Sequence, residues 1–207
     1  MNEQHLREKV VELAASLFDR GYSVGSAGNI SVRTSDGYLM TPTNSSLGRL
    51  EADRLSLLDA DFQHVSGDRP TKEVPMHRAV YEARPDARAI VHLHSTHVTA
   101  LSCLWVPGKP LIPALTPYFV MRVGRDVPVV RYFMPGSAEA VDEIRQAARR
   151  APAVVLAHHG SLVAGGSLEA AVNAAEELEV TAQLALLLRG ASPNVLSDEE
   201  VDALVGR

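Results

Sequence analysis

Three histidines stand within seven residues in the segment VHLHSTH, residues 91–97. Alternate side chains of a β-strand lie on one face, so His92 and His94 point the same way if this segment is extended. Two imidazoles in that arrangement can take neighbouring corners of a tetrahedral zinc site, with Zn–N distances of ~2.0 Å. His97 is out of phase with the pair. The spacing predicts a metal site, against the alternative of strand-end histidines that only form hydrogen bonds.

A third ligand is expected from VLAHHGS, residues 155–161. The apolar run Val154–Ala157 predicts a buried strand, and Gly160 predicts a turn directly after it. Strand ends commonly present functional groups. Because neighbouring side chains of a strand point to opposite faces, only one of His158 and His159 can face the metal. A catalytic zinc typically has three protein ligands and one open position, which this set would provide.

An acidic residue stands at the expected start of a helix in RPTKEVPMHRAVYE, residues 69–82. Thr71 is the expected N-cap, which places Glu73 in the first turn, where Pro75 is tolerated. One interpretation is a glutamate that complements the positive end of the helix dipole. The other is a role in the metal site, which the two histidine segments favour.

Three further segments, SAGNIS, TPTNSS and PTKE, offer groups that could hold an anion. The residues concerned are Gly28, Asn29, Thr43, Asn44, Thr71 and Lys72. Free N–H groups at a helix start bind anions, and a lysine adds a full positive charge. Each segment taken alone is more typical of an ordinary turn. The sequence has neither a Walker A pattern nor a G-x-G-x-x-G at a helix start, which argues against a nucleotide site.

The elements that must position these groups alternate between strand and helix. Strands are expected at Asn29–Arg33, Tyr38–Thr41, Arg88–His94, Val127–Tyr132 and Val154–His158. The Asp36-Gly37 pair predicts a hairpin between the first two strands and therefore a mixed sheet. The segment VPGKPLIPALTPY, residues 106–118, is too rich in proline for either element. The pattern indicates an α/β fold in one domain, residues 1–207.

The helices are expected to carry apolar residues on one face. In residues 1–21 these are Leu6, Val10, Leu13 and Leu17, which indicates an amphipathic first helix rather than a secretory signal. The other helices are expected near 73–83, at Thr96–Leu104, Ala138–Arg149 and Leu168–Leu188, and in SDEEVDAL, which begins with a Ser-x-x-Glu capping box.

Composition narrows the possible partners. The formal net charge is −5 and the basic residues are dispersed, so a nucleic-acid partner is not expected. No apolar run approaches the roughly 18 residues of a membrane span. Cys103 is the sole cysteine, which excludes an internal disulfide and fits a cytoplasmic location. Its apolar surroundings, TALSCLW, predict a buried, unreactive thiol.

Taken in order, the motifs GSAGNISVR, TPTNSSLG, PTKEVPMH, VHLHSTH, ALTPY and AHHG resemble the class II aldolase/adducin family, over about residues 6–190. The resemblance implies a three-layer α/β/α fold with a mixed, mostly antiparallel central sheet. It also implies a homotetramer with zinc sites near the subunit boundaries.

The resemblance also implies roles for individual residues. His92, His94 and His159 correspond to the zinc ligands, with one Zn²⁺ per chain. Glu73 corresponds to the catalytic acid and base, which can also ligate the metal before substrate arrives. The three anion-holding segments correspond to the substrate-phosphate site.

The stretches TNSSLGRL, HVSGDRPTKE and TPYFVMRVG resemble one branch of the family more closely, the 3-oxo-tetronate 4-phosphate decarboxylases. Thr71 and Lys72 stand where the aldolases have two serines. That branch implies a β-keto acid that loses carbon dioxide to leave an enediolate of dihydroxyacetone phosphate. Zinc would act as a Lewis acid, and Glu73, or alternatively Tyr118, would protonate the carbanionic carbon.

Three alternatives stay open. An L-fuculose-phosphate-type aldolase would cleave a phosphorylated ketose to the same enediolate. A ribulose-phosphate 4-epimerase-like enzyme would use the same zinc to return an isomer. A non-catalytic adducin-like module is disfavoured because all three histidines are present. Lys72 could hold the phosphate or orient the leaving carboxylate.

Overall fold

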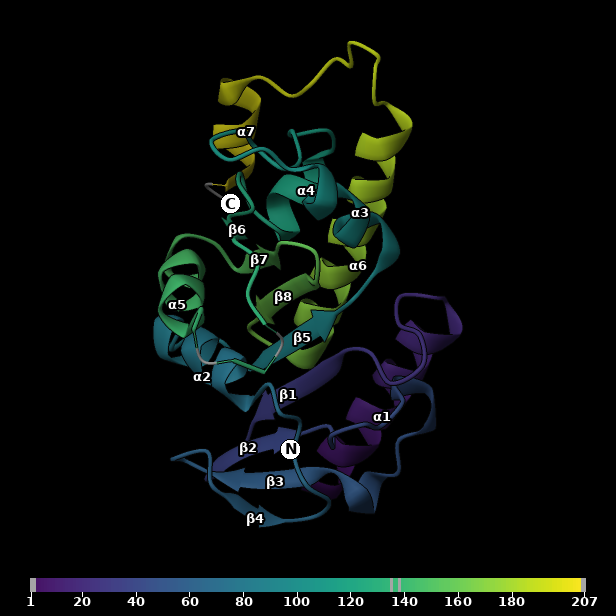
Figure 1. Cartoon of the computed structure of the whole chain (residues 1–207), viewed down its shortest axis with the longest axis vertical. Coiled ribbons are helices and arrows are strands. Elements are labelled where there is room, and N and C mark those ends of the chain that lie inside the picture. Colours follow the sequence, from purple (N-terminus) through teal and green to yellow (C-terminus); the bar gives the residue numbers. More distant parts are fainter. Residues whose placement is uncertain (1–2, 135, 138, 206–207) are drawn as a thin grey trace.

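A computed structural model describes residues 3–134, 136–137 and 139–205 (Figure 1). In these residues one eight-stranded sheet has the strand order β4-β3-β2-β1-β5-β8-β7-β6. Each neighbouring pair is antiparallel except β6 and β7, which are parallel. The expectation of a mixed, mostly antiparallel sheet is therefore confirmed, while the single-domain assignment stays a prediction.

The bounds of the elements follow in chain order. They are α1 (Glu3–Asp19), β1 (Asn29–Arg33), β2 (Gly37–Met40), the 3₁₀ turns η1 (Leu47–Arg49) and η2 (Ala52–Arg54), β3 (Ser56–Asp59), β4 (His64–Ser66), α2 (Val74–Ala83), β5 (Ala89–Leu93), α3 (Thr96–Leu104), α4 (Pro117–Arg122), β6 (Val129–Val130), α5 (Val141–Arg150), β7 (Ala153–Leu156), β8 (Gly160–Gly165), α6 (Leu168–Leu187) and α7 (Asp198–Val205).

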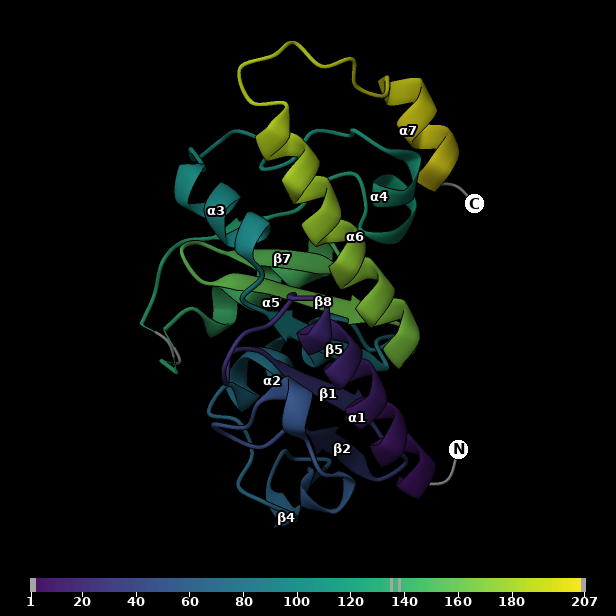
Figure 2. The ribbon, with the colours of Figure 1, turned by 90° about the vertical axis from the view of Figure 1, so that its right-hand side faces the viewer.

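Helices cover both faces of the sheet, which makes the predicted three layers (Figures 1 and 2). Helices α1, α3, α4, α6 and α7 pack on one face, and α2 and α5 pack on the other. Strand β5 shows how one strand serves both cores. Its residues Ala89, Val91 and Leu93 face the larger helical layer, and Ile90 faces α2 and α5.

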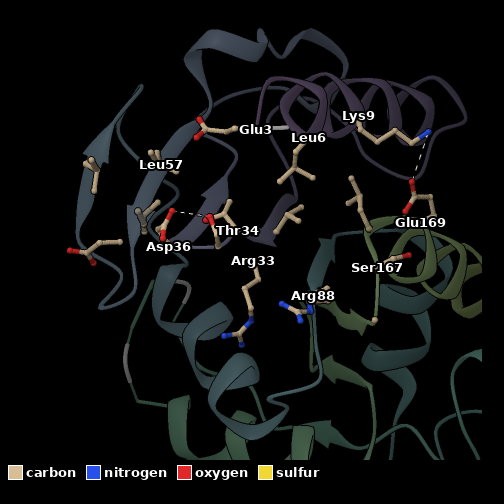
Figure 3. Close-up of a pocket in the computed structure, with 17 residues that line it drawn as sticks. Glu3, Leu6, Lys9, Arg33, Thr34, Asp36, Leu57, Arg88, Ser167 and Glu169 are labelled. Carbon is tan, nitrogen blue, oxygen red and sulfur yellow. Dashed lines mark hydrogen bonds and ion pairs between the residues drawn. The ribbon is translucent and has the colours of Figure 1, made fainter. Parts of the chain in front are cut away.

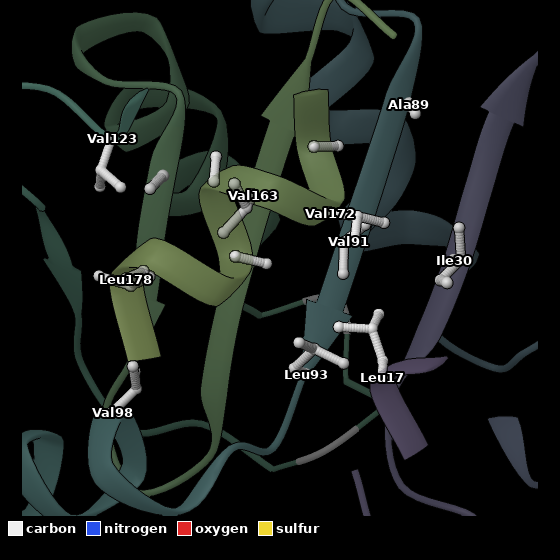
Figure 4. Packing of buried hydrophobic residues seen from close by; sticks show 14 of the residues in the cluster. Leu17, Ile30, Ala89, Val91, Leu93, Val98, Val123, Val163, Val172 and Leu178 are labelled. Atoms are coloured by element: carbon white, nitrogen blue, oxygen red, sulfur yellow. The ribbon is translucent and has the colours of Figure 1, made fainter. Parts of the chain in front are cut away.

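The larger core lies between β1, β5 and β8 on one side and α1 and α6 on the other (Figure 4). Leu17 of α1 and Leu178 of α6 are fully buried in it. In α1, Val10 is also buried and Leu6 and Leu13 are partly buried, so the predicted apolar face is confirmed. Burial of each such side chain contributes roughly 1.5–3 kcal/mol, which holds the strands rigid beneath the site.

Several predicted elements have the expected bounds, and others differ. Strand β1 and helix α3 match, while β6 is limited to Val129–Val130. Helix α5 begins at Val141, and the predicted start at Ala138 lies outside the described residues. The capping box of the last helix is present, because the Ser197 N–H donates to Glu200 Oε2 at 2.8 Å and the Glu200 N–H donates to Ser197 Oγ at 3.2 Å.

Among the described residues, three strands and one α-helix were not expected, namely β3, β4, β8 and α4, and neither were the 3₁₀ turns η1 and η2. The proline-rich segment 106–118 was expected to be irregular, yet α4 begins inside it at Pro117. Proline is tolerated there because the first helical N–H groups have no intrahelical partner, and Thr116 is the N-cap. Strand β4 is wholly exposed and short, so it lacks the apolar alternation that identifies a strand.

The prediction of a buried thiol is wrong. Cys103 is exposed on α3, whose buried residues are Val98, Leu101 and Ser102. Successive helical residues are turned by about 100°, so an apolar sequence around a residue does not bury it.

No helix within the described ranges is long and apolar enough to cross a membrane.

Candidate metal centre

Three imidazole nitrogens converge at the end of β5. His94 Nε2 lies 2.9 Å from His92 Nε2 and 3.0 Å from His159 Nε2. The carboxylate of Glu73 completes the group, with Oε2 at 3.2 Å from His92 Nε2 and Oε1 at 3.4 Å from His159 Nε2. Together the four residues form a candidate metal-binding cluster.

Strand pairing places these histidines. His92 lies within β5, and His94 follows the strand by one residue, so their alternate side chains share a face as expected. His159 directly precedes β8, which is antiparallel to β5. A Cβ at Gly160 would lie 2.1 Å from the Leu93 carbonyl oxygen. Only glycine permits this close approach of the two strands, which brings His159 against His94.

The other two nearby histidines face elsewhere. His158 is exposed and has φ +61°, a left-handed conformation that turns its side chain away while His159 faces the cluster. His97 Nδ1 lies 2.8 Å from Glu179 Oε1 of α6. The same carboxylate accepts the N–H groups of His97 and Val98, at the start of α3. His97 therefore belongs to a contact between helices.

The surroundings of His94 and His159 favour neutral imidazoles. Burial, with repulsion from His92 and His159, lowers the pKa of His94 to about 3. Burial and repulsion from His92 lower the pKa of His159 to about 4. His92 donates from Nδ1 to the Ser161 carbonyl oxygen at 2.8 Å, so a neutral His92 presents the lone pair of Nε2 to the cluster.

These atoms fit a tetrahedral cation. Zn–N bonds of ~2.0 Å at tetrahedral angles separate two ligand nitrogens by ~3.3 Å, close to the observed 2.9 and 3.0 Å. The bond from His92 to a backbone carbonyl is the usual means of orienting a ligating imidazole. His159 Nδ1 is buried and has no hydrogen-bond partner within the described residues, and its ring lies edge-on to Phe133 instead.

Helix α2 begins two residues later than expected, so Glu73 rather than Thr71 is the N-cap. Thr71 precedes the helix and accepts the Glu73 N–H through Oγ1 at 3.2 Å. The Glu73 side chain makes no capping hydrogen bond, so it does not bond to the free N–H groups at the start of α2. Instead Oε2 accepts a hydrogen bond from Asn29 Nδ2 at 2.7 Å.

The charge state of Glu73 follows from its neighbours. Burial by itself would raise the pKa of this carboxyl. The hydrogen bond and charge interaction with His92, the bond from Asn29 and the charge interaction with His159 outweigh it. The net pKa is well below the ordinary range, so Glu73 is a carboxylate at neutral pH.

The cluster opens into a cavity of about 440 Å³. All three predicted anion-holding segments line it, together with His94, His159 and Glu73. Gly28 has φ +77°, and a Cβ there would lie 2.8 Å from the His92 carbonyl oxygen, so glycine is required beside the histidine strand. The Lys72 side chain is exposed and forms no ion pair with any described residue, which leaves its ammonium free for an anionic ligand.

Tyr118 is not part of this cavity within one chain. It lies on α4, is 60% exposed and stacks under the Arg122 guanidinium, which is 5.6 Å from the ring centroid. The alternative of a packed ring with a bonded hydroxyl does not describe it either. Its predicted role in proton transfer stays a prediction.

Sequence reasoning missed three polar residues behind the cluster, Ser31, His77 and Tyr81, which are buried between β1 and α2. A usable signal was present. Asn29 and Ser31 alternate on one strand face, and Glu73, His77 and Tyr81 recur every fourth residue.

A larger cavity, about 690 Å³, lies at the opposite ends of the same strands (Figure 3). It begins where β1 ends and β5 starts, and it contains none of the predicted site residues. Lys9 is 3.9 Å from Glu169, and the Arg33 guanidinium lies over the rings of Tyr38 and Tyr81. Most of its charges therefore have protein partners.

Comparison with known proteins agrees with this geometry. The model of the class II aldolase and adducin N-terminal domain family matches residues 8–186. A 3-oxo-tetronate 4-phosphate decarboxylase from Pectobacterium atrosepticum is 46% identical over 205 residues, covering 98% of this chain and 94% of that protein. An L-fuculose phosphate aldolase from Haemophilus influenzae is 34% identical, covering 100% of this chain and 95% of that protein.

Comparison with solved structures finds a protein of the same fold. The crystal structure of YgbL from Klebsiella pneumoniae has a TM-score of 0.93 and 48% sequence identity, and 99% of each chain is covered.

Proposed function

The chain belongs to the class II aldolase and adducin family, and we propose on this basis that it decarboxylates 3-oxo-tetronate 4-phosphate to dihydroxyacetone phosphate and carbon dioxide. As in its decarboxylase and aldolase relatives, the activity is that of a metal-dependent lyase. The observation that carries the proposal is the cluster of three histidines and Glu73, which faces a polar cavity beside Lys72, a lysine with no ion-pair partner in the described part of the chain.

In this proposal His92, His94 and His159 hold one Zn²⁺ per chain, and Glu73 lies close enough to be a fourth ligand at rest. When bound, the cation supplies positive charge that stabilises the oxyanion developing on the substrate ketone, a contribution of several kcal/mol.

The cavity wall would bind the two anionic ends of the substrate. The Thr43 and Thr71 hydroxyls and the segments at Gly28 and Asn44 surround the proposed phosphate site. Asn29 belongs to the residues predicted to hold the phosphate, and its side-chain amide donates a hydrogen bond to the Glu73 carboxylate. Lys72 supplies a cation at the mouth, positioned to orient either the phosphate or the carboxylate that leaves.

Glu73 would move the proton. As a carboxylate it can accept the proton of the hydroxyl group beside the ketone. Breaking the bond between the carboxylate carbon and its neighbour releases carbon dioxide and leaves the electron pair on an enediolate. Glu73 then donates its proton to the carbon that has lost the carboxylate. Solvent supplies one proton to the oxygen of the hydroxyl group that Glu73 had deprotonated. Such acid–base catalysis typically contributes roughly 10²–10⁴-fold.

The test is to incubate the purified, metal-analysed protein with 3-oxo-tetronate 4-phosphate and, separately, with L-fuculose 1-phosphate. We expect stoichiometric carbon dioxide and dihydroxyacetone phosphate from the first substrate and little product from the second. A homotetramer and a cytoplasmic location are predicted alongside, to be checked by light scattering and by cell fractionation.

Each other outcome identifies an alternative. Cleavage of L-fuculose 1-phosphate without carbon dioxide from the oxo-acid would make the protein an aldolase, as its 34% identity to an L-fuculose phosphate aldolase allows. An isomer of a pentulose phosphate in place of dihydroxyacetone phosphate would make it an epimerase. Absence of both bound metal and any turnover would favour an adducin-like module.

A further inference from the structure

A chain of hydrogen bonds runs behind Glu73, between β1 and α2. Tyr81 Oη lies 3.0 Å from Ser31 Oγ, which lies 2.7 Å from His77 Nδ1. On its other side, His77 Nε2 lies 2.6 Å from Asn29 Oδ1. Asn29 Nδ2 then donates to Glu73 Oε2 at 2.7 Å. Four contacts thus connect a buried tyrosine to the carboxylate of the candidate site.

The hydrogen-bond chain follows from the two-residue repeat of a strand and the four-residue spacing along one side of a helix. Asn29 and Ser31 alternate on β1 and face α2, while the intervening Ile30 faces the larger core. Glu73, His77 and Tyr81 recur every four residues along one side of α2. A strand face and a helix face therefore interleave their polar side chains, and His77 is fully buried at the centre.

The partners fix the direction of every bond. The Asn29 amide donates to the Glu73 carboxylate through Nδ2, so its Oδ1 faces His77 and can only accept. His77 Nε2 must then carry the hydrogen. A neutral imidazole has one N–H, so Nδ1 accepts from the Ser31 hydroxyl, whose oxygen accepts from Tyr81. Burial lowers the pKa of His77 to about 3, which agrees with a neutral ring.

We propose that His77 is a positioning residue, whose Nε2–H tautomer fixes the orientation of the Asn29 amide and, through it, the Glu73 carboxylate. Without this donor the amide can turn by 180° and present its oxygen to the carboxylate, which removes one hydrogen bond and adds repulsion. Glu73 would then leave the orientation that faces His92 and His159. The role rests on the proposed function of Glu73.

The first test uses the wild-type, metal-free protein and needs no substrate. Nitrogen-15 NMR of the imidazole side chains should show His77 as the neutral Nε2–H tautomer at neutral pH. The resonance is assigned by its loss in His77→Gln. A protonated ring, or the Nδ1–H tautomer, would overturn the proposal. Because no turnover is measured, this result is independent of whether the protein decarboxylates anything.

The second test separates positioning from packing. His77→Leu keeps an apolar volume but removes the donor, and we expect kcat to fall roughly 10²-fold, as misplaced catalytic groups do, with KM changed less than about threefold. His77→Gln retains an N–H that can reach Asn29 and should recover about tenfold or more of that loss. Bound metal should stay near one per chain in both variants.

Two further variants keep this test decisive. Ser31→Ala removes the donor to Nδ1 but leaves Asn29 Oδ1 as the acceptor of Nε2–H, so His77 should keep the Nε2–H tautomer with a smaller loss of kcat, and a change to the Nδ1–H tautomer would contradict the proposal. His64→Gln, at an exposed histidine of β4, is the matched control and should leave kcat unchanged. If folded His77→Leu has the wild-type kcat, or if Leu and Gln lose activity equally, His77 is only a packing residue.

Discussion

The two ends of the central strands carry cavities of opposite character. At the end where β5 finishes, a cavity of about 440 Å³ meets three imidazoles and a carboxylate, of which His92 is buried and the others are partly buried, and a lysine without an ion-pair partner among the described residues. At the end where β5 begins, a cavity of about 690 Å³ is lined by charges that mostly have partners, such as Lys9 with Glu169. The smaller cavity holds the polar groups that lack a protein counter-charge or could bind a metal ion, namely Lys72 and the cluster of three histidines and Glu73. Convergence of polar groups, rather than size, is therefore our reason for placing the proposed function at this end, and each prediction below tests that contrast.

The largest effect is expected from removing a metal ligand. His94→Ala takes away the nitrogen that lies between the other two, so bound zinc should fall to near zero and turnover by roughly 10³-fold or more. Elemental analysis and a decarboxylation assay measure both. His158→Ala changes the exposed neighbour of His159 and should be much milder, as should Arg88→Ala at the larger cavity. A reversed ranking of the two histidines would assign the third ligand to the wrong neighbour.

Glu73→Gln is expected to rank second. The amide keeps the size of the side chain but cannot carry a proton between oxygen and carbon, so kcat should fall roughly 10²–10⁴-fold while substrate still binds. Thermal unfolding should change little, because Glu73 makes no capping bond to α2. Glu82→Gln, at the other end of the same helix, is the control. An unaltered kcat would return Glu73 to a structural role.

A third comparison concerns Lys72, a cation that lines the smaller cavity and has no partner among the described side chains. Lys72→Ser should reduce decarboxylation about 10–100-fold, the value of one hydrogen bond to a charged group. If Lys72 holds the carboxylate, binding of the phosphate-only analogue phosphoglycolohydroxamate should change much less, as measured by calorimetry. Equal weakening of both would place Lys72 on the phosphate. Lys109→Ser, at an exposed lysine in the segment 106–118, should change neither quantity.

The most gradual effect is a pH dependence of stability, spread over several pH units. The pKa of His77 is about 3 in the folded chain against 6.5 when unfolded, so the unfolded state binds the proton more readily between these values. Stability should therefore fall as pH drops from 6.5 towards 3, by at most ~1.4 kcal/mol per pH unit for this one group. In metal-free protein, denaturant unfolding of His77→Gln should show a shallower slope in that window. His64→Gln should keep the wild-type slope.

Some of the site could be read from local spacing. The period of a strand put His92 and His94 on one face, and their Nε2 atoms lie 2.9 Å apart. The choice of His159 over His158 could not be read from the residues alone, because it depends on the left-handed backbone at His158 and on the approach of β8 to β5. The family resemblance supplied that choice.

The remaining differences have tertiary causes. Tyr118 was placed near the chemistry by its motif; within one chain its ring is exposed on α4 and does not line the cavity, and its role stays a prediction. Cys103 was expected inside because its neighbours in sequence are apolar, yet the helix turns it outward. His77 was passed over because its partners Asn29 and Ser31 come from a strand more than 40 residues earlier.

Glu179 links the candidate site to the cooperative unfolding of the molecule. Its carboxylate, on α6, holds the first N–H groups of α3, just after His94, so the turn that follows this histidine is tied to a helix in the larger layer. The amides of His97 and Val98 are therefore expected to exchange with deuterium only when α6 itself detaches. The strand end bearing the histidines and α6 would then behave as one foldon, and thermal motion alone would not loosen the cluster before the core opens.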